Sequence, residues 1–316
     1  MASYFVLHVS DLHFGEDAGV VNAYDARNRH HWRPGRMPEL WRLTSHSDLA
    51  AEALTRFVVE YEQEVDLVLI TGDLATSGMA GDLDAAHRFV ADLAGQVSKP
   101  IGLIPGNHDR YRTGVDVRPR RACSPGGSAF DAVFQSRWPV GKSAGLIFAA
   151  ERDGRPLIII GADLTLREGD FGTGSKYAHF GQGHAYEERL RDLAARTRDA
   201  QQEHENAAVI WAVHFAPRYP SIDRGLALLE SDRLLTLAEE LGVSHILCGH
   251  THTPKVYSSG AFPSVEVHCA GTATHAACGS GNWIHLYAIE VDADGAFISE
   301  ERFQLDAGEG AFMKVV

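Results

Sequence analysis

The sequence contains few cysteines and no long apolar run. Its 316 residues include four cysteines, Cys123, Cys248, Cys269 and Cys278, whose spacing matches no paired metal-binding motif. We therefore expect reduced thiols, as in a cytoplasmic protein, rather than a disulfide framework. No apolar run approaches the roughly 20 residues of a membrane span, and the first residues lack the charged and apolar regions of a signal peptide. These absences predict a cytoplasmic protein without a membrane partner.

Positive charge is also scarce. The chain has 29 Lys and Arg residues against 42 Asp and Glu residues, which gives a formal net charge of −13. Such a surface repels phosphate backbones and anionic lipids, so nucleic acid is disfavoured as a substrate or partner. The length allows a core that buries roughly three quarters of the surface of the unfolded chain. No internal repeat is present, and no feature of the sequence specifies an oligomeric state.

What the sequence does contain is a set of apolar runs that each end in Asp, Asn or His. In open α/β sheets, ligands bind outside the carboxyl ends of the strands, so we expect these polar side chains to converge at one site. Polar groups at the mouths of buried strands are costly without partners, and a metal ion would supply one. The runs are Tyr4–Ser10 before Asp11 and His13, Asp66–Ile70 before Asp73, Ile101–Ile104 before Asn107, His108 and Asp109, Ala208–Val213 before His214, and His245–Cys248 before His250 and His252.

Strands that alternate with amphipathic helices, followed by a strand-rich end, predict the α/β class. Because the motifs run through most of the chain and must meet at one place, we expect a single domain over residues 1–316. It should carry long active-site loops at about 14–46, 110–127 and 163–185. The first of these loops is predicted either as a lid or substrate wall, or as a solvated insertion.

Local patterns place the main helices and the last strands. The first helix should begin at the N-cap Ser47 and continue to about Gln63, with Leu49, Ala53, Phe57 and Tyr61 forming one apolar stripe. Further helices are expected at about 83–95, 185–204 and 231–241. Strands are expected at 264–270, 283–291 and 296–305, the last being the final strand of the chain.

Taken in order, Asp-x-His, Gly-Asp, Gly-Asn-His-Asp, His and Gly-His-x-His resemble the motifs of the calcineurin-like metallophosphoesterase superfamily, over residues 4–252. The segment 9–15 resembles bacterial members related to cyclic-nucleotide phosphodiesterases. However, His214-Phe215-Ala216-Pro217 departs from the His-His-Pro of many such members. The resemblance implies a four-layer α/β/β/α sandwich, with two mixed β-sheets face to face and helices outside.

The resemblance also implies two metal ions. Oxygen and imidazole ligands without cysteine suit Mn, Fe or Zn. By the resemblance, Asp11, His13 and His252 hold the first ion, Asn107, His214 and His250 hold the second, and Asp73 bridges them.

The residues around Asn107 have further expected roles. In the family, the histidine that matches His108 faces the substrate, stabilises charge and protonates the leaving oxygen, and Asp109 would hold its ring. Asn107 and His108 are expected to bind substrate together with Arg110 and Arg112, because guanidinium groups suit phosphate oxygens. The alternative for the arginines is a solvated, charged loop. His8 follows the pattern of a core strand and is expected to be a packed core histidine.

The sequence therefore predicts a metal-dependent phosphoester hydrolase with a small-molecule substrate, in which a metal-bridging hydroxide attacks phosphorus in line. A phosphodiesterase that acts on a small or nucleotide-like diester is favoured. The alternatives are a phosphomonoesterase, including a protein phosphatase, a nuclease on the same site, or a non-catalytic scaffold of the same fold. A scaffold is expected to have lost ligands, whereas all the expected ligands are present here.

Overall fold

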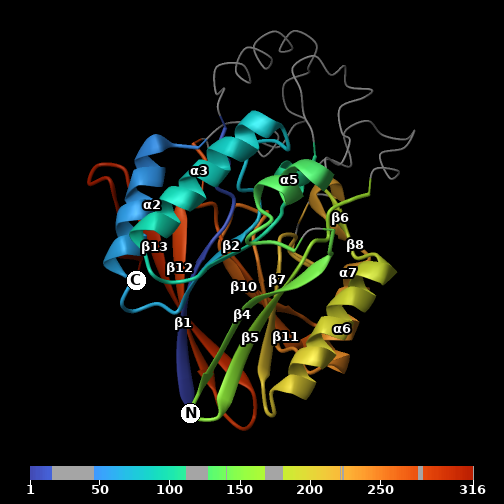
Figure 1. Ribbon diagram of the computed structural model, residues 1–316. Coiled ribbons are helices and arrows are strands. Elements are labelled where there is room, and N and C mark those ends of the chain that lie inside the picture. Colours follow the sequence, from blue (N-terminus) through green and yellow to red (C-terminus); the bar gives the residue numbers. More distant parts are fainter. Residues whose placement is uncertain are drawn as a thin grey trace.

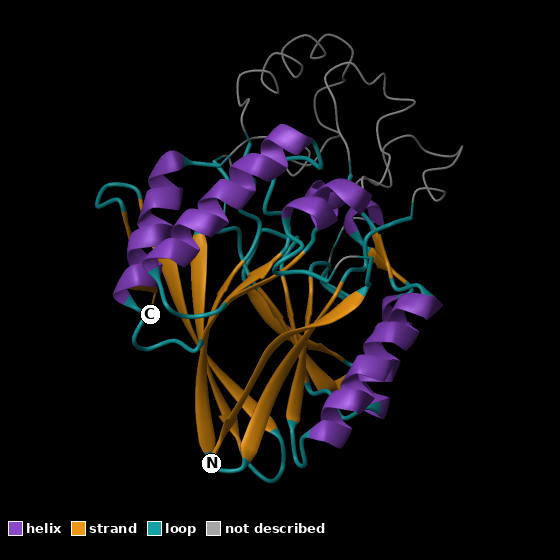
Figure 2. Ribbon diagram, in the orientation of Figure 1, coloured by secondary structure: helices purple, strands orange, loops and turns teal. Residues whose placement is uncertain are grey.

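Two six-stranded mixed β-sheets face each other and carry helices on their outer sides (Figures 1 and 2). The structure is a computed structural model that describes residues 1–15, 46–111, 127–139, 141–167, 181–220, 222, 224–276 and 280–315. The expected four-layer α/β/β/α sandwich is confirmed.

The order of the strands follows from their hydrogen-bonded neighbours. The first sheet runs in the order β14 (Ala311–Val315), β13 (Ala296–Asp306), β12 (Trp283–Val291), β1 (Ala2–Val9), β2 (Leu67–Thr71) and β3 (Ile101–Ile104). The second runs in the order β10 (Lys255–Ser259), β11 (Phe262–Cys269), β9 (His245–Cys248), β7 (Ala208–Val213), β5 (Arg155–Ala162) and β4 (Ala144–Arg152). Helices α2 (Asp48–Glu60) and α3 (Ala80–Gln96) cover the first sheet, and α5 (Gly127–Val133) packs on α3. Helices α6 (Glu187–Glu203) and α7 (Ser231–Glu240) cover the second sheet.

The parallel strands determine where a site can form. In the first sheet β1, β2 and β3 are parallel to one another, and in the second sheet β5, β7, β9 and β11 are parallel. The carboxyl ends of parallel neighbours meet at the same edge of a sheet, and this is the edge where ligands bind in α/β folds. The segments after β1, β2, β3, β7 and β9 therefore emerge together.

Alternating side chains of the second sheet build two separate cores. In β5, Ile158 and Ile160 pack toward α6 and α7, whereas Leu157 and Ile159 pack toward the first sheet. This alternation is the period of two that a strand buried on both faces requires. The core between the sheets thus joins the two halves of the sandwich. None of the helices that the structure describes combines the length and the apolarity needed to cross a bilayer.

Most expected helices and strands are present. The predictions missed the C-terminal strand and several short strands. The helices at 83–95, 185–204 and 231–241 correspond to α3, α6 and α7. The prediction that residues 296–305 form the final strand is wrong, because Ala311–Val315 pairs antiparallel with β13. Strand β10 and the short pair β6 (Gly183–His184) and β8 (Leu228–Leu229) were not expected from the sequence. Residues 16–45, 112–126 and 168–180, which make up most of the expected long loops, lie outside the described residues.

Helix α2 begins as expected and buries Ala53 and Phe57 of the expected stripe, but Leu49 is exposed. The Ser47 hydroxyl caps the helix by accepting a hydrogen bond from the Ala50 backbone N–H at 3.3 Å. Leu49, expected in the apolar stripe, is 40% exposed, whereas Leu54 is 1% exposed. A strict four-residue spacing rotates by about 40° per step around a helix, so a stripe built on it leaves the buried face within a few steps.

The two leucines of α2 provide a test of this packing. Leu54→Ala should lower the free energy of unfolding by about 2–5 kcal/mol, since it removes a fully buried side chain and leaves a cavity. Leu49→Ala makes the same chemical change at an exposed position of the same helix and should change stability by no more than about 0.5 kcal/mol. Urea unfolding of both variants measures the difference, and equal losses would contradict the observed orientation of α2.

Candidate metal centre

The expected metal ligands and His108 lie together at the carboxyl edge of the two sheets. Asp11 and His13 follow β1, Asp73 follows β2, and Asn107 and His108 open the one-turn helix α4 (Asn107–Arg110) after β3. From the second sheet, His214 follows β7, and His250 and His252 follow β9. Apart from His108, which keeps 12% of its side chain exposed, these residues are buried. Side chains that are far apart in the sequence thus converge in one buried group.

The first cluster of donor atoms is formed by Asp11, His13 and His252. The Nε2 atom of His252 lies 3.2 Å from Asp11 Oδ1 and 3.2 Å from His13 Nε2. Asp11 Oδ2 accepts the His250 backbone N–H at 2.9 Å, but the buried Oδ1 atom has no hydrogen-bond partner. An orphaned carboxylate oxygen that faces two imidazole nitrogens is the geometry expected of a metal ligand.

The second cluster is formed by Asp73, His214 and His250, with the Asn107 amide beside them. His214 Nε2 lies 3.2 Å from Asp73 Oδ2, 3.1 Å from Asn107 Oδ1 and 3.2 Å from His250 Nδ1. The other nitrogen of each ring donates to a carbonyl oxygen, His214 Nδ1 to Thr71 at 2.7 Å and His250 Nε2 to Leu226 at 3.0 Å. When both rings are neutral, as metal ligation requires, they point lone pairs at each other, and a cation between them satisfies both.

Asp73 lies between the two clusters. It forms a further group of potential ligands with His13 and His108, and His108 Nε2 lies 3.9 Å from Asp73 Oδ2. The other oxygen, Oδ1, accepts the His108 backbone N–H at 2.8 Å. The donor set of oxygens and imidazoles without sulfur fits Mn, Fe or Zn. The residues present therefore fit a metal centre on the evidence of their orphaned and converging lone pairs.

The backbone at the site is held in an unusual conformation. Asp11, His13, Asp73, His250 and His252 all have positive φ angles, between 51° and 72°. They account for five of the nine non-glycine residues with positive φ in the described part of the chain. Such residues cost about 1–3 kcal/mol each and persist only where the surrounding structure imposes them. Close approach adds a further constraint, because a Cβ atom at Gly106 would collide with the Asp73 side chain, and one at Gly249 with Ser10.

The electrostatics of the site favour positive charge next to the carboxylates. Burial alone would raise the pKa of Asp11, but the neighbouring His252 holds it below its usual range. Burial would lower the pKa of His214, but the Asp73 carboxylate raises it to about 9. Burial and the adjacent His214 lower the pKa of His250 to about 3. The centre thus stabilises one positive charge beside Asp73 and keeps His250 neutral, as a metal ligand must be.

Comparison with known proteins agrees with this geometry. The sequence model of the calcineurin-like phosphoesterase family matches residues 6–254. The chain belongs to this family. No curated protein gives a significant match to the sequence.

Solved structures share the fold of this phosphoesterase at low sequence identity. A dimetal phosphatase from Danio rerio aligns with a TM-score of 0.56 and 12% identity, over 93% of this chain and 98% of that chain. The purple acid phosphatase PPD1 from yellow lupin (Lupinus luteus) aligns with a TM-score of 0.55 and 13% identity, over 99% of this chain and 53% of that chain. A sulfate thiohydrolase, SoxB, from a Thermus species aligns with a TM-score of 0.54 and 15% identity, over 98% of this chain and 58% of that chain. At these identities the alignments establish the fold and leave the substrate open.

In this phosphoesterase the expected role of Asp109 needs correction. Its carboxylate accepts backbone N–H groups from Ala75 at 2.8 Å, Gly106 at 2.8 Å and Leu74 at 3.2 Å. Burial, and then the charge of Asp73, raise the pKa of Asp109 to about 7. The His108 ring is held instead by the Thr76 carbonyl oxygen, which accepts from Nδ1 at 2.7 Å. Asp109 therefore fixes the backbone of two loops, and Thr76 orients the imidazole.

The expectation that Arg110 belongs to an exposed, substrate-binding rim is also corrected. Its side chain is 6% exposed and forms ion pairs with Asp131 at 2.7 Å and Asp163 at 2.9 Å. The guanidinium also lies over the Phe130 ring, 4.8 Å from its centroid. Arg110 thus joins α4 to α5 and to the end of β5, and its charge is directed to carboxylates of the protein. Arg112, the other expected substrate arginine, lies outside the described residues.

His275 and Thr272 contribute to the site, although neither was expected to. The ring of His275 packs edge-on against His13 and in a tilted arrangement against His252, at centroid distances of 4.8 and 5.1 Å. Its segment is tied to the first motif, since the Thr272 hydroxyl donates to the Asp11 carbonyl at 2.6 Å. His275 follows the expected strand at 264–270 and belongs to none of the motifs, so no pattern in the sequence pointed to it. His8, by contrast, is buried as expected and hydrogen-bonds with Thr71 Oγ1 at 2.8 Å and Tyr287 OH at 3.2 Å.

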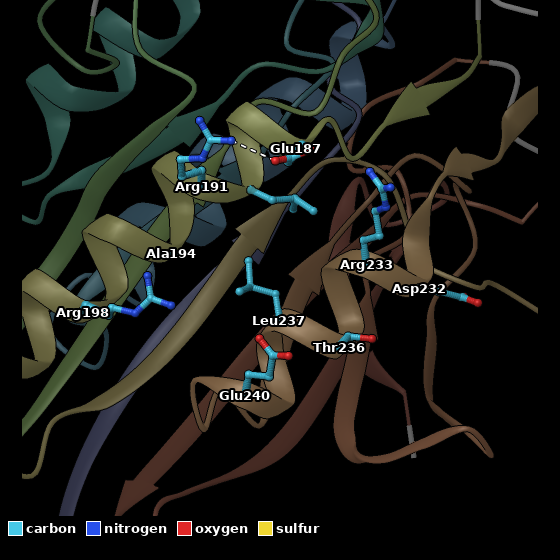
Figure 3. Close-up of a pocket in the computed structure, with 10 residues that line it drawn as sticks. Glu187, Arg191, Ala194, Arg198, Asp232, Arg233, Thr236, Leu237 and Glu240 are labelled. Atoms are coloured by element: carbon cyan, nitrogen blue, oxygen red, sulfur yellow. Dashed lines mark hydrogen bonds and ion pairs between the residues drawn. The ribbon is translucent and has the colours of Figure 1, made fainter.

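A groove of about 440 Å³ lies elsewhere, on the outer face between α6 and α7 (Figure 3). Leu190, Ala194 and Leu237 contribute apolar surface, and Arg191, Arg198 and Glu240 contribute charged groups. No residue of the metal centre lines this groove. The groove is therefore separate from the candidate metal centre.

The buried ion pairs of Arg110 lead to a stability prediction. Arg110→Ala should lower the free energy of unfolding by about 3 kcal/mol, because Asp131 loses its ion pair and the buried Asp163 keeps only the longer one with Arg189, at 3.4 Å. Arg218 pairs through two nitrogens with Asp232 but is 41% exposed, so Arg218→Ala should lower the stability far less than Arg110→Ala. Thermal and urea unfolding of both variants compare the two. A stable Arg110→Ala variant with a raised KM would restore Arg110 to substrate binding.

Proposed function

We propose that this protein is a phosphodiesterase that hydrolyses a small or nucleotide-like diester with two metal ions bound at the candidate centre. The family membership supports metal-dependent hydrolysis of a phosphoester. The proposed ligands are Asp11, His13 and His252 for one ion, Asn107, His214 and His250 for the other, and Asp73 as the bridge.

The position of Asp73 supports the bridging assignment. It is adjacent to His214 in one cluster and belongs with His13 to the group that borders the other cluster. A carboxylate can offer a separate oxygen to each of two cations, which no imidazole or amide of the centre can do as well. When bound, the ions would activate a water molecule for attack on phosphorus and withdraw charge from the phosphoryl oxygens.

His108 is proposed to donate the proton that the leaving oxygen requires. The Thr76 carbonyl oxygen accepts from Nδ1, so the proton that His108 gives up is the one that Nε2 carries in the imidazolium form, on the nitrogen 3.9 Å from Asp73 Oδ2. His108 is also the most exposed of the histidines and carboxylates described above as the site. A buried network that holds one nitrogen and leaves the other toward the substrate is the arrangement expected of a general acid.

The substrate class rests on chemistry and sequence. A net charge of −13 disfavours polyanionic partners, which supports a small substrate. The sequence 9–15 resembles phosphodiesterase-like members of the family, which supports a diester. A phosphomonoesterase is the second candidate, because the zebrafish and lupin structures that share the fold are named as phosphatases. A scaffold is disfavoured by the complete set of donors in the centre.

The proposal includes a single domain acting in the cytoplasm. Both sheets supply residues to the centre, which supports one functional unit. Cys248 and Cys269, the cysteines in the described residues, are free and buried, which is compatible with a reducing compartment.

The function is tested by a panel of substrates on the metal-reconstituted protein. Bis(p-nitrophenyl) phosphate, p-nitrophenyl phosphate and cyclic nucleotides should be compared with Mn, Fe and Zn. We expect the highest kcat/KM for a diester. Higher efficiency on monoesters with every metal would replace the phosphodiesterase by the second candidate, and no turnover of either class would remove the enzymatic proposal.

The bridging role predicts that Asp73→Asn loses turnover while the chain stays folded, because the amide offers only one good donor oxygen. Asp92→Asn makes the same change at an exposed position of α3 and should keep wild-type kinetics. Metal content, circular dichroism and kcat are measured for both. Turnover that survives in Asp73→Asn at matched metal content would falsify the bridge.

His108→Ala should keep its metal content but lower kcat by about 10²–10⁴, the usual contribution of a general acid. The loss should be largest for a cyclic nucleotide, whose alkoxide needs a proton, and smallest for a nitrophenolate. His204→Ala, at the end of α6, is the control and should leave kcat unchanged. Equal losses for both leaving groups would assign His108 to electrostatic stabilisation, and a loss of metal would make it a ligand.

A further inference from the structure

A further group of potential metal ligands lies within strands β9 and β11, outside the candidate centre. It consists of His245, Glu266 and His268. His245 opens β9, and β9 is parallel to β11 with Glu266 beside His245 in the register. Roughly 10 Å of strand separates His245 from Cys248, after which the catalytic motif begins. This group therefore shares no residue with the proposed catalytic centre.

The alternation of the second sheet places the three side chains on its inner face. Val265, Val267 and Cys269 of β11 pack with the core under α6 and α7, so Glu266 and His268 point toward the first sheet. Leu247 of β9 belongs to the core between the sheets, and His245 lies two residues before it on the same face. The group thus lies between the sheets, where buried imidazoles are costly without partners.

The spacing of the three donor atoms matches a tetrahedral site. His268 Nε2 lies 3.2 Å from His245 Nδ1 and 3.1 Å from Glu266 Oε2, and His245 Nδ1 lies 3.7 Å from the same oxygen. Ligands held about 2.0–2.1 Å from a tetrahedral ion are separated by about 3.3 Å. In the candidate catalytic centre, the corresponding distances around His214 are 3.1–3.2 Å. The two contacts of His268 Nε2 are therefore as close as those of His214, and the third separation in the group, 3.7 Å, is longer.

The hydrogen bonding of His245 directs a lone pair into the group. Its Nε2 atom donates to the Ala296 carbonyl oxygen at 2.8 Å, so in the neutral ring Nδ1 is the acceptor. Ligating histidines characteristically donate their second nitrogen to a carbonyl in this way. One proton on His268 Nε2 would have to serve both the His245 nitrogen and the Glu266 oxygen. A cation between the three satisfies all of them at once.

Access to the group comes from one side. His245 and His268 are 7% and 1% exposed, whereas the Glu266 side chain is 41% exposed. A water molecule can therefore complete a coordination shell on the side of Glu266, as in sites with three protein ligands and one open position.

We propose that His245, Glu266 and His268 bind a separate divalent transition-metal ion such as Zn²⁺. The ion would join β9 to β11 and, through the hydrogen bond of His245 to Ala296, to the start of β13 in the other sheet. The inference does not depend on the proposed function, because it uses neither the catalytic ligands nor a substrate.

The test measures bound zinc per chain after equilibration with Zn²⁺ and removal of the free ion. The key variants are Glu266→Gln and His245→Gln, which avoid the fully buried His268. Glu290→Gln, at an exposed position of β12, is the control. We expect each key variant to hold one equivalent less than wild type and Glu290→Gln, with unchanged kcat and KM for the best substrate of the panel.

Reconstitution with Co²⁺ gives a second readout. The visible bands of tetrahedral Co²⁺ should lose the same one-equivalent component in Glu266→Gln and His245→Gln. Equal metal content and equal spectra in wild type and both variants, with circular dichroism showing folded chains, would overturn the site. A failure of the catalytic centre lowers the total metal of every protein but leaves this difference, so the two failures are distinguishable.

Discussion

The arrangement of this site depends on two imidazole rings, those of His214 and His250, whose free nitrogens face each other. His214 and His250 each donate one ring nitrogen to a backbone carbonyl, which leaves the other nitrogens 3.2 Å apart beside Asp73 and Asn107. In a buried region, such an arrangement is unfavourable unless positive charge lies between the rings. The Asp73 carboxylate and the Asp11 oxygen that lacks a hydrogen-bond partner also need a positive charge nearby. The polar ends of the strands are thus mutually stable only as a group that binds cations.

Packing and hydrogen bonds elsewhere in the fold hold these groups together. Five donor residues have positive φ angles. The glycines at 106 and 249 allow their own backbone segments to approach the carboxylates of Asp73 and Asp11 closely. Strain of this kind is maintained by the apolar cores on both faces of the second sheet and by the segment after β11, which hydrogen-bonds to the first motif. The stability of the sandwich is therefore partly used to keep the site in a conformation that local preferences disfavour.

Local patterns in the sequence were sufficient to predict the α/β class and the converging donors, whereas the four-layer sandwich was predicted from the resemblance to the family. Each donor stands directly after an apolar run, so its position relative to a strand end can be counted along the chain. Arg110 and Asp109 were misassigned for the opposite reason. The partners of Arg110 are 21 and 53 residues away, at Asp131 and Asp163, and only the packing of α5 and β5 brings them to it.

The group at His245 illustrates the same limit of sequence reasoning. Its ligands belong to two strands that become neighbours only in the sheet, and Glu266-Val267-His268 reads along the chain as an ordinary alternating strand. The C-terminal strand β14 was missed in a similar way, because its assignment depends on pairing with β13 rather than on its own five residues. Contacts set by register are invisible until the strand order is known.

Thr71 connects the catalytic edge to the interior of the sandwich. Its carbonyl oxygen accepts from His214 Nδ1, while its hydroxyl hydrogen-bonds with the core histidine His8, which in turn contacts Tyr287. The orientation of a proposed metal ligand is thus fixed by a buried polar network that spans the first sheet, rather than by the loop that carries the ligand. Because unsatisfied members of such a network are costly, a rotation of His214 would disturb partners on two strands. This coupling explains how a centre built almost entirely on loops can keep the sub-ångström precision that binding and catalysis require.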